Sequence, residues 1–347
     1  MVSCCYLVCM VCSKTIVRFW QRIVMLLAAA LICTSCSTIG SVSYNPWQVI
    51  SLPTEANLQD IAFTGNDDRH GWVVGSEATL FETTDGGTNW KPMALDIDEP
   101  RSRFSSVSFS GAEGWIVGQP SVLLHTEDEG KSWTRIALSS QLPGSPSTIA
   151  AIGPNTADMT TDVGAIYRTS DGGKNWKAIV QDSFGVVRNI NRSEDGQYVA
   201  VSSKGNFYSV WKPGQESWEP HNRNSSRRLQ NMGFTKDGRL WMLARGGQIQ
   251  FSDPSNPEGW GKPFFPDRKA SWGLLDMAYR TDNEVWVAGG GGNLLCSLDG
   301  GKTWQKDREV EDVPANFYRI VFMGPDRGFI IGASGTLLKY QGSAQAA

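Results

Sequence analysis

The stretch TTDGGTNW, residues 83–90, decides the fold of this chain because it recurs. The pattern returns as TEDEGKSW at 126–133, TSDGGKNW at 169–176 and SLDGGKTW at 297–304. Each copy is an Asp-box. Its Asp can bond the backbone amides of its own turn, its Gly residues supply positive φ, and its Trp covers the turn. The sequence therefore predicts hairpin turns, with a structural role and no catalytic role for the four aspartates Asp85, Asp128, Asp171 and Asp299.

The tryptophans repeat at a regular spacing along the chain, and this spacing continues in the units that lack the Asp-box. Consecutive gaps of 43, 43, 43, 42, 42 and 44 residues separate Trp47, Trp90, Trp133, Trp176, Trp218, Trp260 and Trp304. Repeats of roughly 40–50 residues are typical of propellers and solenoids. Each unit contains three short β-patterned runs, such as FSSVSF, EGWIVG and SVLLHT, and a fourth run that begins at the Trp. Four strands in a unit make one propeller blade.

These units predict an all-β fold, a seven-bladed β-propeller over residues 47–341 with a short tail at 342–347. The last unit ends at GTLLKYQG and has no tryptophan, so we expect the strand at Trp47 to join the last blade and close the ring. Closure of this kind removes exposed sheet edges. The innermost strands are expected near residues 58–63, 104–109, 147–152, 186–191, 229–234, 273–279 and 317–322.

The first 35 residues are predicted to be an export signal. They contain three basic residues, no acidic residue, and an apolar run from Ile23 to Cys33. The run is shorter than the roughly 20 residues of a membrane-spanning helix. Small residues before Cys36 resemble a lipoprotein processing site, although Cys33 stands where Leu is usual. We predict a lipid on Cys36 and a tether over 36–46; ordinary cleavage or an uncleaved anchor are the alternatives.

Composition narrows the chemistry of the exported part. Six of the seven cysteines lie at or before Cys36, which leaves Cys296 alone and predicts neither a disulfide framework nor a cysteine-ligated metal. The three histidines show no metal-ligand spacing. Without the leader the chain has a net charge of −6, which disfavours nucleic-acid binding. We expect a monomer without cofactor or metal.

Arginine is concentrated in blades four to six, on the face that carries the loops between second and third strands and the connections between blades. The acidic runs DIDE and EVED belong to other connections of that face. Because the planar guanidinium recognises carboxylates and carbonyls, we interpret the arginines as a partner-binding site; solvated loops with scattered ion pairs are the alternative. The predicted site comprises Arg188, Arg223, Arg227, Arg228, Arg245 and Arg268.

A second set of polar residues is predicted to line the central channel. Counting back from the last apolar residue of each inner strand gives Asp60, Ser106, Ile149, Arg188, Asn231, Asp276 and Arg319. In this register Arg319 lies between Asp60 and Asp276, so mutual neutralisation explains the three charges better than catalysis.

Four segments carry a more specific resemblance: NRNSSRRLQ at 222–230, SWGLLDMAYR at 271–280, EVWVAGGGGNLL at 284–295 and PANFYRIVF at 314–322. With the repeats, they resemble the photosystem II stability and assembly factor family of cyanobacteria and chloroplasts. The resemblance covers Trp47 to Tyr340 and implies a non-enzymatic propeller on the lumenal side of the thylakoid membrane. It also implies binding of newly made reaction-centre protein, especially the precursor of the D1 subunit, by the arginine patch.

Two other functions remain open from the sequence. Sialidase-like glycoside hydrolases use Asp-box propellers, but they need catalytic carboxylates, or a Tyr–Glu pair with three arginines, around the axis. A general periplasmic scaffold or carbohydrate-binding propeller also fits the fold, although it leaves the arginine cluster unexplained. Blades four and five keep their Trp but replace the Asp-box by KPGQESW and PSNPEGW, next to the arginines, which suggests that function lies there.

Overall fold

The computed structural model describes residues 39–42, 45–65, 68–95, 102–180, 185–223, 225–253, 255–266 and 273–342. The leader, Cys36 and Arg268 lie outside these ranges. The described part of the chain forms strands only, and it contains no helix with the length and apolar character needed to cross a bilayer. The strands belong to one compact unit that begins at Gly40.

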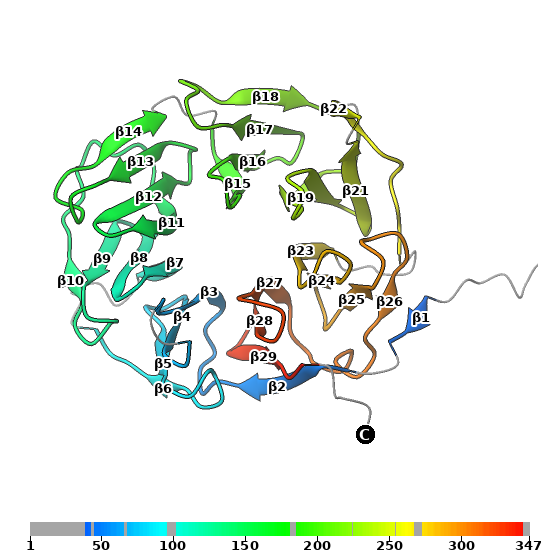
Figure 1. Ribbon diagram of the computed structural model, residues 1–347, viewed down its shortest axis with the longest axis horizontal. Coiled ribbons are helices and arrows are strands. Elements are labelled where there is room, and N and C mark those ends of the chain that lie inside the picture. The colour runs from blue at the N-terminus through cyan, green and yellow to red at the C-terminus, as the bar shows by residue number, and fades with distance from the viewer. Residues whose placement is uncertain are drawn as a thin grey trace, which may run out of the picture. The chain divides into compact units, whose positions relative to one another are not determined.

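The strands form seven sheets around a central axis, which confirms the seven-bladed propeller (Figure 1). The first three blades are regular and follow the chain order. Blade one holds β3 (Leu58–Phe63), β4 (Gly71–Gly75), β5 (Leu80–Thr83) and β6 (Lys91–Pro92); blade two holds β7 (Arg103–Ser110), β8 (Glu113–Gln119), β9 (Val122–Thr126) and β10 (Thr134–Arg135); blade three holds β11 (Pro146–Gly153), β12 (Thr156–Thr161), β13 (Ile166–Thr169) and β14 (Lys177–Val180).

The remaining blades complete the ring. Blade four holds β15 (Val187–Arg192), β16 (Tyr198–Ser202), β17 (Phe207–Trp211) and β18 (Glu219–Asn222); blade five holds β19 (Leu229–Phe234), β20 (Leu240–Ala244), β21 (Gln248–Asp253) and β22 (Asn256–Trp260). Blade six holds β23 (Leu274–Tyr279), β24 (Val285–Gly289), β25 (Leu294–Ser297), β26 (Gln305–Lys306) and β1 (Gly40–Ser41); blade seven holds β27 (Phe317–Phe322), β28 (Gly328–Gly332), β29 (Thr336–Tyr340) and β2 (Trp47–Ser51).

The second strand of a blade is apolar on both sides because it packs between two neighbouring blades. All five residues of β4, GWVVG, are buried, and so are all five of β24, VWVAG. A strand that is covered on both faces reads as a continuous apolar run and does not alternate. This arrangement explains the continuous apolar runs of β4 and β24.

The N-terminal strand closes the ring as predicted. β2 pairs antiparallel with β29, from Trp47 opposite Tyr340 to Ser51 opposite Thr336. The Trp47 ring lies edge-on to Trp286 of blade six, with 5.4 Å between ring centroids. Blade seven is therefore built from both ends of the propeller, and Trp47 also ties it to the preceding blade.

A fifth strand on blade six was not predicted. β1 pairs parallel with β26, with Gly40 opposite Gln305, and the amide of Val42 donates to the carbonyl of Lys306 over 3.0 Å. Val42 also packs against the apolar core between blades six and seven. These residues fall within 36–46, which the sequence suggested as a tether. A two-residue strand held by backbone bonds leaves no side-chain periodicity that a sequence could reveal.

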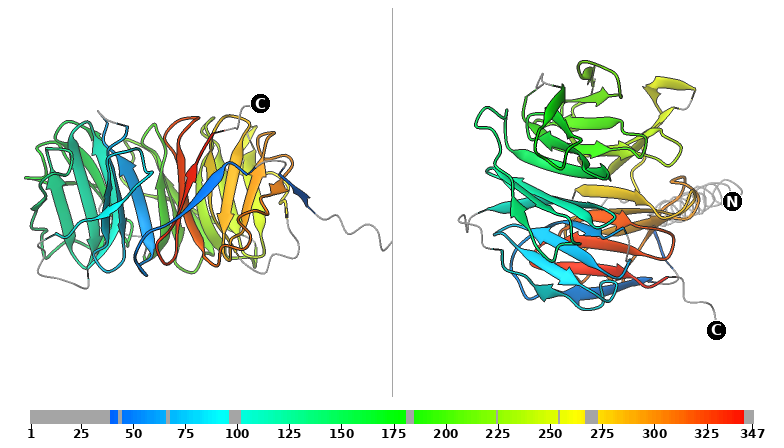
Figure 2. Two further views of the ribbon diagram at one scale, coloured as in Figure 1. Left: turned by 90° about the horizontal axis from the view of Figure 1, so that it is seen from below. Right: turned by 60° about the vertical axis from the view of Figure 1, so that its left-hand side comes forward.

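Figure 2 shows the blades from the side, with strands running between two faces. We call the face with the loops 162–165, 203–206 and 245–247 and the blade-to-blade connections the crossover face. The opposite face carries the turns 84–90, 127–133, 170–176 and 298–304, and we call it the Asp-box face. The arginine site was predicted on the crossover face.

Every inner strand contains a β-bulge near the crossover face. In β3 the register shifts between Leu58 and Asp60, and the same shift occurs in all six other inner strands. The residues after the bulge are Asp60, Ser106, Thr148, Asn189, Asn231, Asp276 and Arg319. A bulge re-aims side chains while it bends the strand.

The predicted channel residues therefore occupy the position after the bulge in five blades and lie one residue away from it in the other two. In blade three the position belongs to Thr148 and not to Ile149, because Ile152, used as the last apolar residue, is 37% exposed. In blade four it belongs to Asn189, and Arg188 is the bulged residue itself. The strand VRNINR has too few apolar residues to define a register.

Candidate functional site

The Asp-box turns have the structure that the sequence predicts. In the first box the carboxylate of Asp85 accepts from the amides of Thr88 (3.0 Å) and Asn89 (2.9 Å), and Gly86 and Gly87 have φ of 73° and 82°. The indole of Trp90 donates to the carbonyl of Gly87 over 3.2 Å. Hydrogen bonds, that from the Asn89 amide foremost, lower the pKa of Asp85 to about 2.

The other boxes repeat this chemistry. Bonds led by the Ser132 hydroxyl lower the pKa of Asp128 to about 2, and bonds led by the Asn175 side chain lower the pKa of Asp171. Partial burial opposes the effect at Asp299, but hydrogen bonds from Thr303 still lower its pKa to about 2. Carboxylates that accept several bonds within their own turn are poor general acids or bases. The four aspartates stabilise turns.

The arginines of blades four and five gather on the crossover face. Arg223, Arg227 and Arg228 lie in the connection between β18 and β19, and Arg245 follows β20, so two separate loops meet. The Arg223 Nη1 donates to the carbonyl of Arg227 over 2.7 Å, and the Arg227 Nη1 donates to the carbonyl of Arg245 over 3.2 Å. The amide of Arg245 donates to the carbonyl of Arg228 over 2.9 Å. Hydrogen bonds from the arginines thus connect the loops to one another.

Arg188 joins this group from the neighbouring inner strand. Its Nη1 donates to Oε1 of Gln230 in blade five over 3.2 Å, and its Nη2 donates to the carbonyl of Ser203 over 2.8 Å. The structure therefore brings five of the six predicted arginines together, and Arg268 lies outside the described residues. We call Arg188, Arg223, Arg227, Arg228 and Arg245 the arginine cluster.

The arginine cluster is not neutralised by the described part of the protein. Its hydrogen bonds go to carbonyl and amide oxygens, and none of its members forms an ion pair with a described carboxylate. Several arginines elsewhere are paired with carboxylates, as Arg280 is with Glu284 at 2.5 Å. The Arg227 guanidinium lies 4.8 Å from the centroid of Phe265, and desolvation lowers the pKa of Arg223. Exposed, uncompensated guanidinium groups can bind carboxylates and carbonyls of another molecule.

One glycine makes room for this arrangement. Gly246 has a φ of 80°, and a Cβ there would lie 2.5 Å from Nη1 of Arg227. The sequence ARGGQ therefore supplies the tight turn and the space for a neighbouring guanidinium together.

The axial charges are satisfied inside the protein. Nη1 of Arg319 lies 2.8 Å from Oδ1 of Asp60, and the other oxygen of Asp60 accepts from the hydroxyl of Ser106 over 2.7 Å. Asp276 instead accepts from the amide of Ile320 and the side chain of Asn231, both over 2.9 Å. The predicted pair of Arg319 with Asp60 forms directly, whereas amide donors bind Asp276. Burial raises the pKa of Asp276 to about 6.

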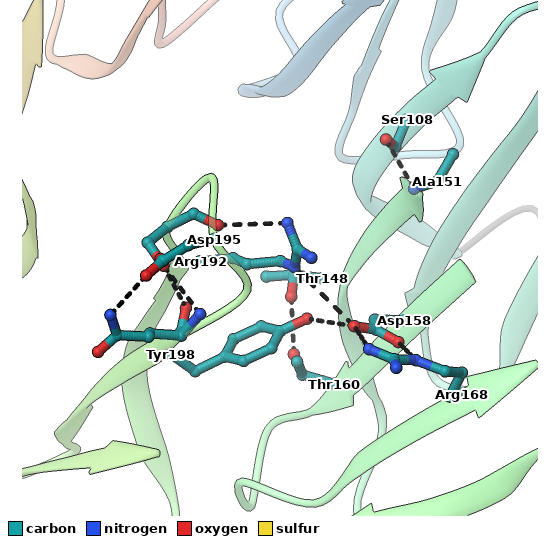
Figure 3. Close-up of polar contacts among 11 residues, drawn as sticks. Ser108, Thr148, Ala151, Asp158, Thr160, Arg168, Arg192, Asp195 and Tyr198 are labelled. Atoms are coloured by element: carbon teal, nitrogen blue, oxygen red, sulfur yellow. Dashed lines mark hydrogen bonds and ion pairs between the residues drawn. The ribbon is translucent and has the colours of Figure 1, made fainter. Parts of the chain in front are cut away.

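One charged cluster was missed from the sequence (Figure 3). Asp158 is 1% exposed and lies in β12 at the position that Trp72 occupies in β4. Its carboxylate accepts from Nε and Nη2 of Arg168 over 2.6 and 2.8 Å, and from the hydroxyl of Tyr198 in blade four over 3.4 Å. Burial, followed by the nearby Asp158 charge, raises the pKa of Tyr198. An Asp within TADMTT, where other repeats have GWVVG or EGWIVG, was the available signal.

This cluster joins blades three and four and offers no pair of carboxylates for acid–base catalysis. A separate hollow lies between blades two and three. It measures about 1350 Å³, and apolar side chains including Leu142, Met159 and Trp176 line part of it, without any member of the arginine cluster. In the described ranges no three His, Cys, Asp or Glu residues are placed to hold a metal ion. The one described cysteine, Cys296, is buried, and burial raises its pKa.

Comparison with known proteins shows the family. The sequence model described as "Photosynthesis system II assembly factor YCF48" matches residues 39–341. The Photosystem II assembly lipoprotein Ycf48 of Trichormus variabilis is 64% identical over 329 residues, which cover 95% of this chain and 96% of that protein.

Two solved structures share both fold and sequence. One, "YCF48 bound to D1 peptide", has a TM-score of 0.86 and 59% identity and covers 88% of this chain and 99% of that one. The other, YCF48 from Cyanidioschyzon merolae, has a TM-score of 0.79 and 41% identity and covers 86% and 99%. On the strength of this sequence match across nearly the whole propeller, the chain belongs to the YCF48 family of photosystem II assembly factors.

Proposed function

We propose that this protein binds a segment of the D1 reaction-centre protein through the arginine cluster and so stabilises early photosystem II assembly intermediates. The observation that carries the proposal is the set of five arginines from three segments that lack carboxylate partners among the described residues. The relative with 59% identity, whose structure bears the words "bound to D1 peptide", supports the choice of partner. Newly made D1 precursor is the form we expect to bind.

The proposed mechanism requires only that the protein binds the partner segment reversibly, and it includes no chemical reaction. The blades form a closed ring, so the loops that carry the arginines are fixed by strands on both sides. A preorganised surface binds a flexible segment with a smaller ordering cost. A planar guanidinium group can donate two parallel hydrogen bonds to a carboxylate and one to a carbonyl. Several modest contacts of this kind allow the partner to leave when later subunits arrive.

We propose that the protein is not an enzyme. A glycosidase needs two carboxylates flanking the scissile bond. In this propeller Asp60 is paired with Arg319, Asp276 accepts amide donors, and the arginine cluster belongs to blades four and five, whereas Asp60 and Asp276 belong to blades one and six. The general scaffold alternative gives no role to unpaired arginines.

We also propose that the mature chain is exported to the lumenal side of the thylakoid membrane and carries a lipid on Cys36. The leader pattern in residues 1–35 supports export. The relative from Trichormus variabilis is named a lipoprotein, which supports the anchor. Mass spectrometry of the protein extracted from membranes tests the lipid directly.

An affinity pull-down from solubilised thylakoids tests the arginine cluster. We expect the triple change of Arg223, Arg227 and Arg228 to Ala to reduce recovery of D1 strongly. The matched control changes Lys131, Lys174 and Lys302 to Ala, because it removes the same charge from the Asp-box face. Equal recovery of D1 by the native protein and the arginine variant would refute the assignment of the site.

A further inference from the structure

We propose that the corner where the outer rim of blade six meets the Asp-box face is the part of the propeller next to the lipid bilayer. This inference rests on the lipid proposed for Cys36. It adds an orientation: the bilayer meets one corner of the disc, and the crossover face with its arginine cluster stays clear of the membrane.

The first step is where the chain joins the disc. β1 lies on the outside of blade six, at the rim (Figure 1; Figure 2). It runs parallel to β26, and Gly40 is opposite Gln305, the first residue of β26 after the Asp-box turn that ends at Trp304. Three contacts hold the segment: the β1 pairing, the bond from Val42 to Lys306, and the packing of Val42 on the core. The chain therefore reaches the propeller at the Asp-box end of the rim.

The second step is the length of the connection. Only four peptide steps separate Cys36 from Gly40. A fully extended chain spans at most about 3.3–3.6 Å per residue, so the connection reaches roughly 14 Å. A lipid on Cys36 would therefore keep Gly40 and the adjoining end of β26 within that distance of the bilayer surface. Blades two and three lie across the ring from blade six and have no such constraint.

The third step is independent of the tether and concerns the surface of the same corner. Leu298, in the Asp-box of blade six, is 61% exposed, the largest exposure among the exposed large hydrophobic residues described. The equivalent residues of the other three boxes are polar: Thr84, Glu127 and Ser170. Lys302 follows in the same turn and is exposed. An exposed apolar side chain with a nearby lysine suits the boundary between acyl chains and headgroups.

The two faces are less suitable for lying flat on lipid. The crossover face carries the arginine cluster that the proposed partner must reach. The Asp-box face carries Asp85 and Asp128, whose pKa values are about 2, so these carboxylates stay charged at neutral pH. Placing charged groups against hydrocarbon is costly. A contact restricted to the blade-six corner leaves the crossover face free and brings only one of the four box aspartates, Asp299, to the level of the headgroups.

Fluorescence quenching in liposomes tests the orientation. The mature chain is coupled through Cys36 to a thiol-reactive lipid, because Cys296 is buried and the coupling then bypasses natural lipidation. A dye is placed by an unnatural amino acid at Lys302, or at Lys131 or Lys174, in separate samples. These three lysines occupy the same place in three Asp-boxes, three residues after the box Asp, so they differ only in their blade. Spin-labelled lipid in the bilayer is the quencher.

We expect the dye at Lys302 to lose most of its fluorescence and the dyes at Lys131 and Lys174 to lose little. Equal quenching at the three sites, strong or weak, would overturn the proposal, because it indicates a flat or freely tumbling disc. Inserting a flexible Gly-Ser linker between Cys36 and Gly40 should reduce the difference between sites. If the difference persists, the corner itself binds lipid; changing Leu298 to Ser, the residue at the equivalent position 170, should then remove it. The D1 pull-down does not depend on these results, so the two proposals fail separately.

Discussion

Substituting Gly87 by Ala should destabilise the junction between blades seven and one. Gly87 has a φ of 82°, and a Cβ there would lie 2.6 Å from the ring of Phe329 in β28. The left-handed backbone costs a residue with a Cβ about 1–2 kcal/mol. Forcing an atom into a packed contact costs about 1–3 kcal/mol more. The total expected loss in the free energy of unfolding is roughly 2–5 kcal/mol.

The neighbouring Gly86 provides the control. Its φ is 73°, but a Cβ there would meet nothing within 4 Å. Blade two carries Glu129 at the equivalent position with a φ of 65°, so a side chain is tolerated. Gly86→Ala should therefore cost only the backbone term, about 1–2 kcal/mol. Urea unfolding followed by tryptophan fluorescence measures both variants. If Gly87→Ala is no more destabilising than Gly86→Ala, the blade contact does not contribute as we argue.

Three other changes test the ring. Asp158→Asn leaves the partly exposed Arg168 without its carboxylate, and urea unfolding should show that the unfolding free energy falls by about 1–2 kcal/mol after allowing for solvent screening. As the control, Asp237→Asn removes the carboxylate of an exposed pair with Arg239 and should change the unfolding free energy little. Removing residues 44–52, which include β2, should lower the thermal midpoint by circular dichroism far more than removing β1 alone; similar midpoints would contradict closure by β2. Burial raises the pKa of Asp276 from 3.8 to about 6, so its contribution favours the folded state below pH 4 and is lost as pH rises through 6. Asp276→Asn should therefore flatten the dependence of the unfolding free energy on pH over that window, leaving the slope from Asp307, whose pKa burial also raises to about 6. An unchanged pH profile would refute the assignment to Asp276.

Side-chain patterns made most of the propeller predictable. The inner strand predicted at 58–63 is β3 at Leu58–Phe63, and the closing strand at Trp47 is β2. Most of the arginine cluster was also foreseeable, because four of its five residues lie in loops whose face follows from strand order alone. β1 could not be predicted, since two backbone-paired residues carry no pattern. The bulge position in β15 also escaped, because the residues VRNINR do not show which side faces the core.

Asp158 was missed for a different reason, and it changes the meaning of the irregular blades. A box glycine packs on an aromatic residue of the preceding blade: a Cβ on Gly130 would lie 2.5 Å from the ring of Trp72, and one on Gly173 would lie 2.9 Å from Trp115. At the position of these tryptophans blade three has Asp158 and blade four has Val199.

Blades four and five follow blades three and four in the ring. In both of them the Asp-box is replaced, although the repeated Trp is kept. Without an aromatic ring to receive it, the glycine turn of the box loses its inter-blade contact. Blade four instead meets Asp158 of blade three through the hydroxyl of Tyr198, which donates to its carboxylate over 3.4 Å. The replaced boxes therefore coincide with a difference in packing on the Asp-box face, whereas the arginine cluster lies at the other ends of the same strands. The two features share blades without sharing a mechanism, so restoring an Asp-box in blade four should leave D1 binding intact.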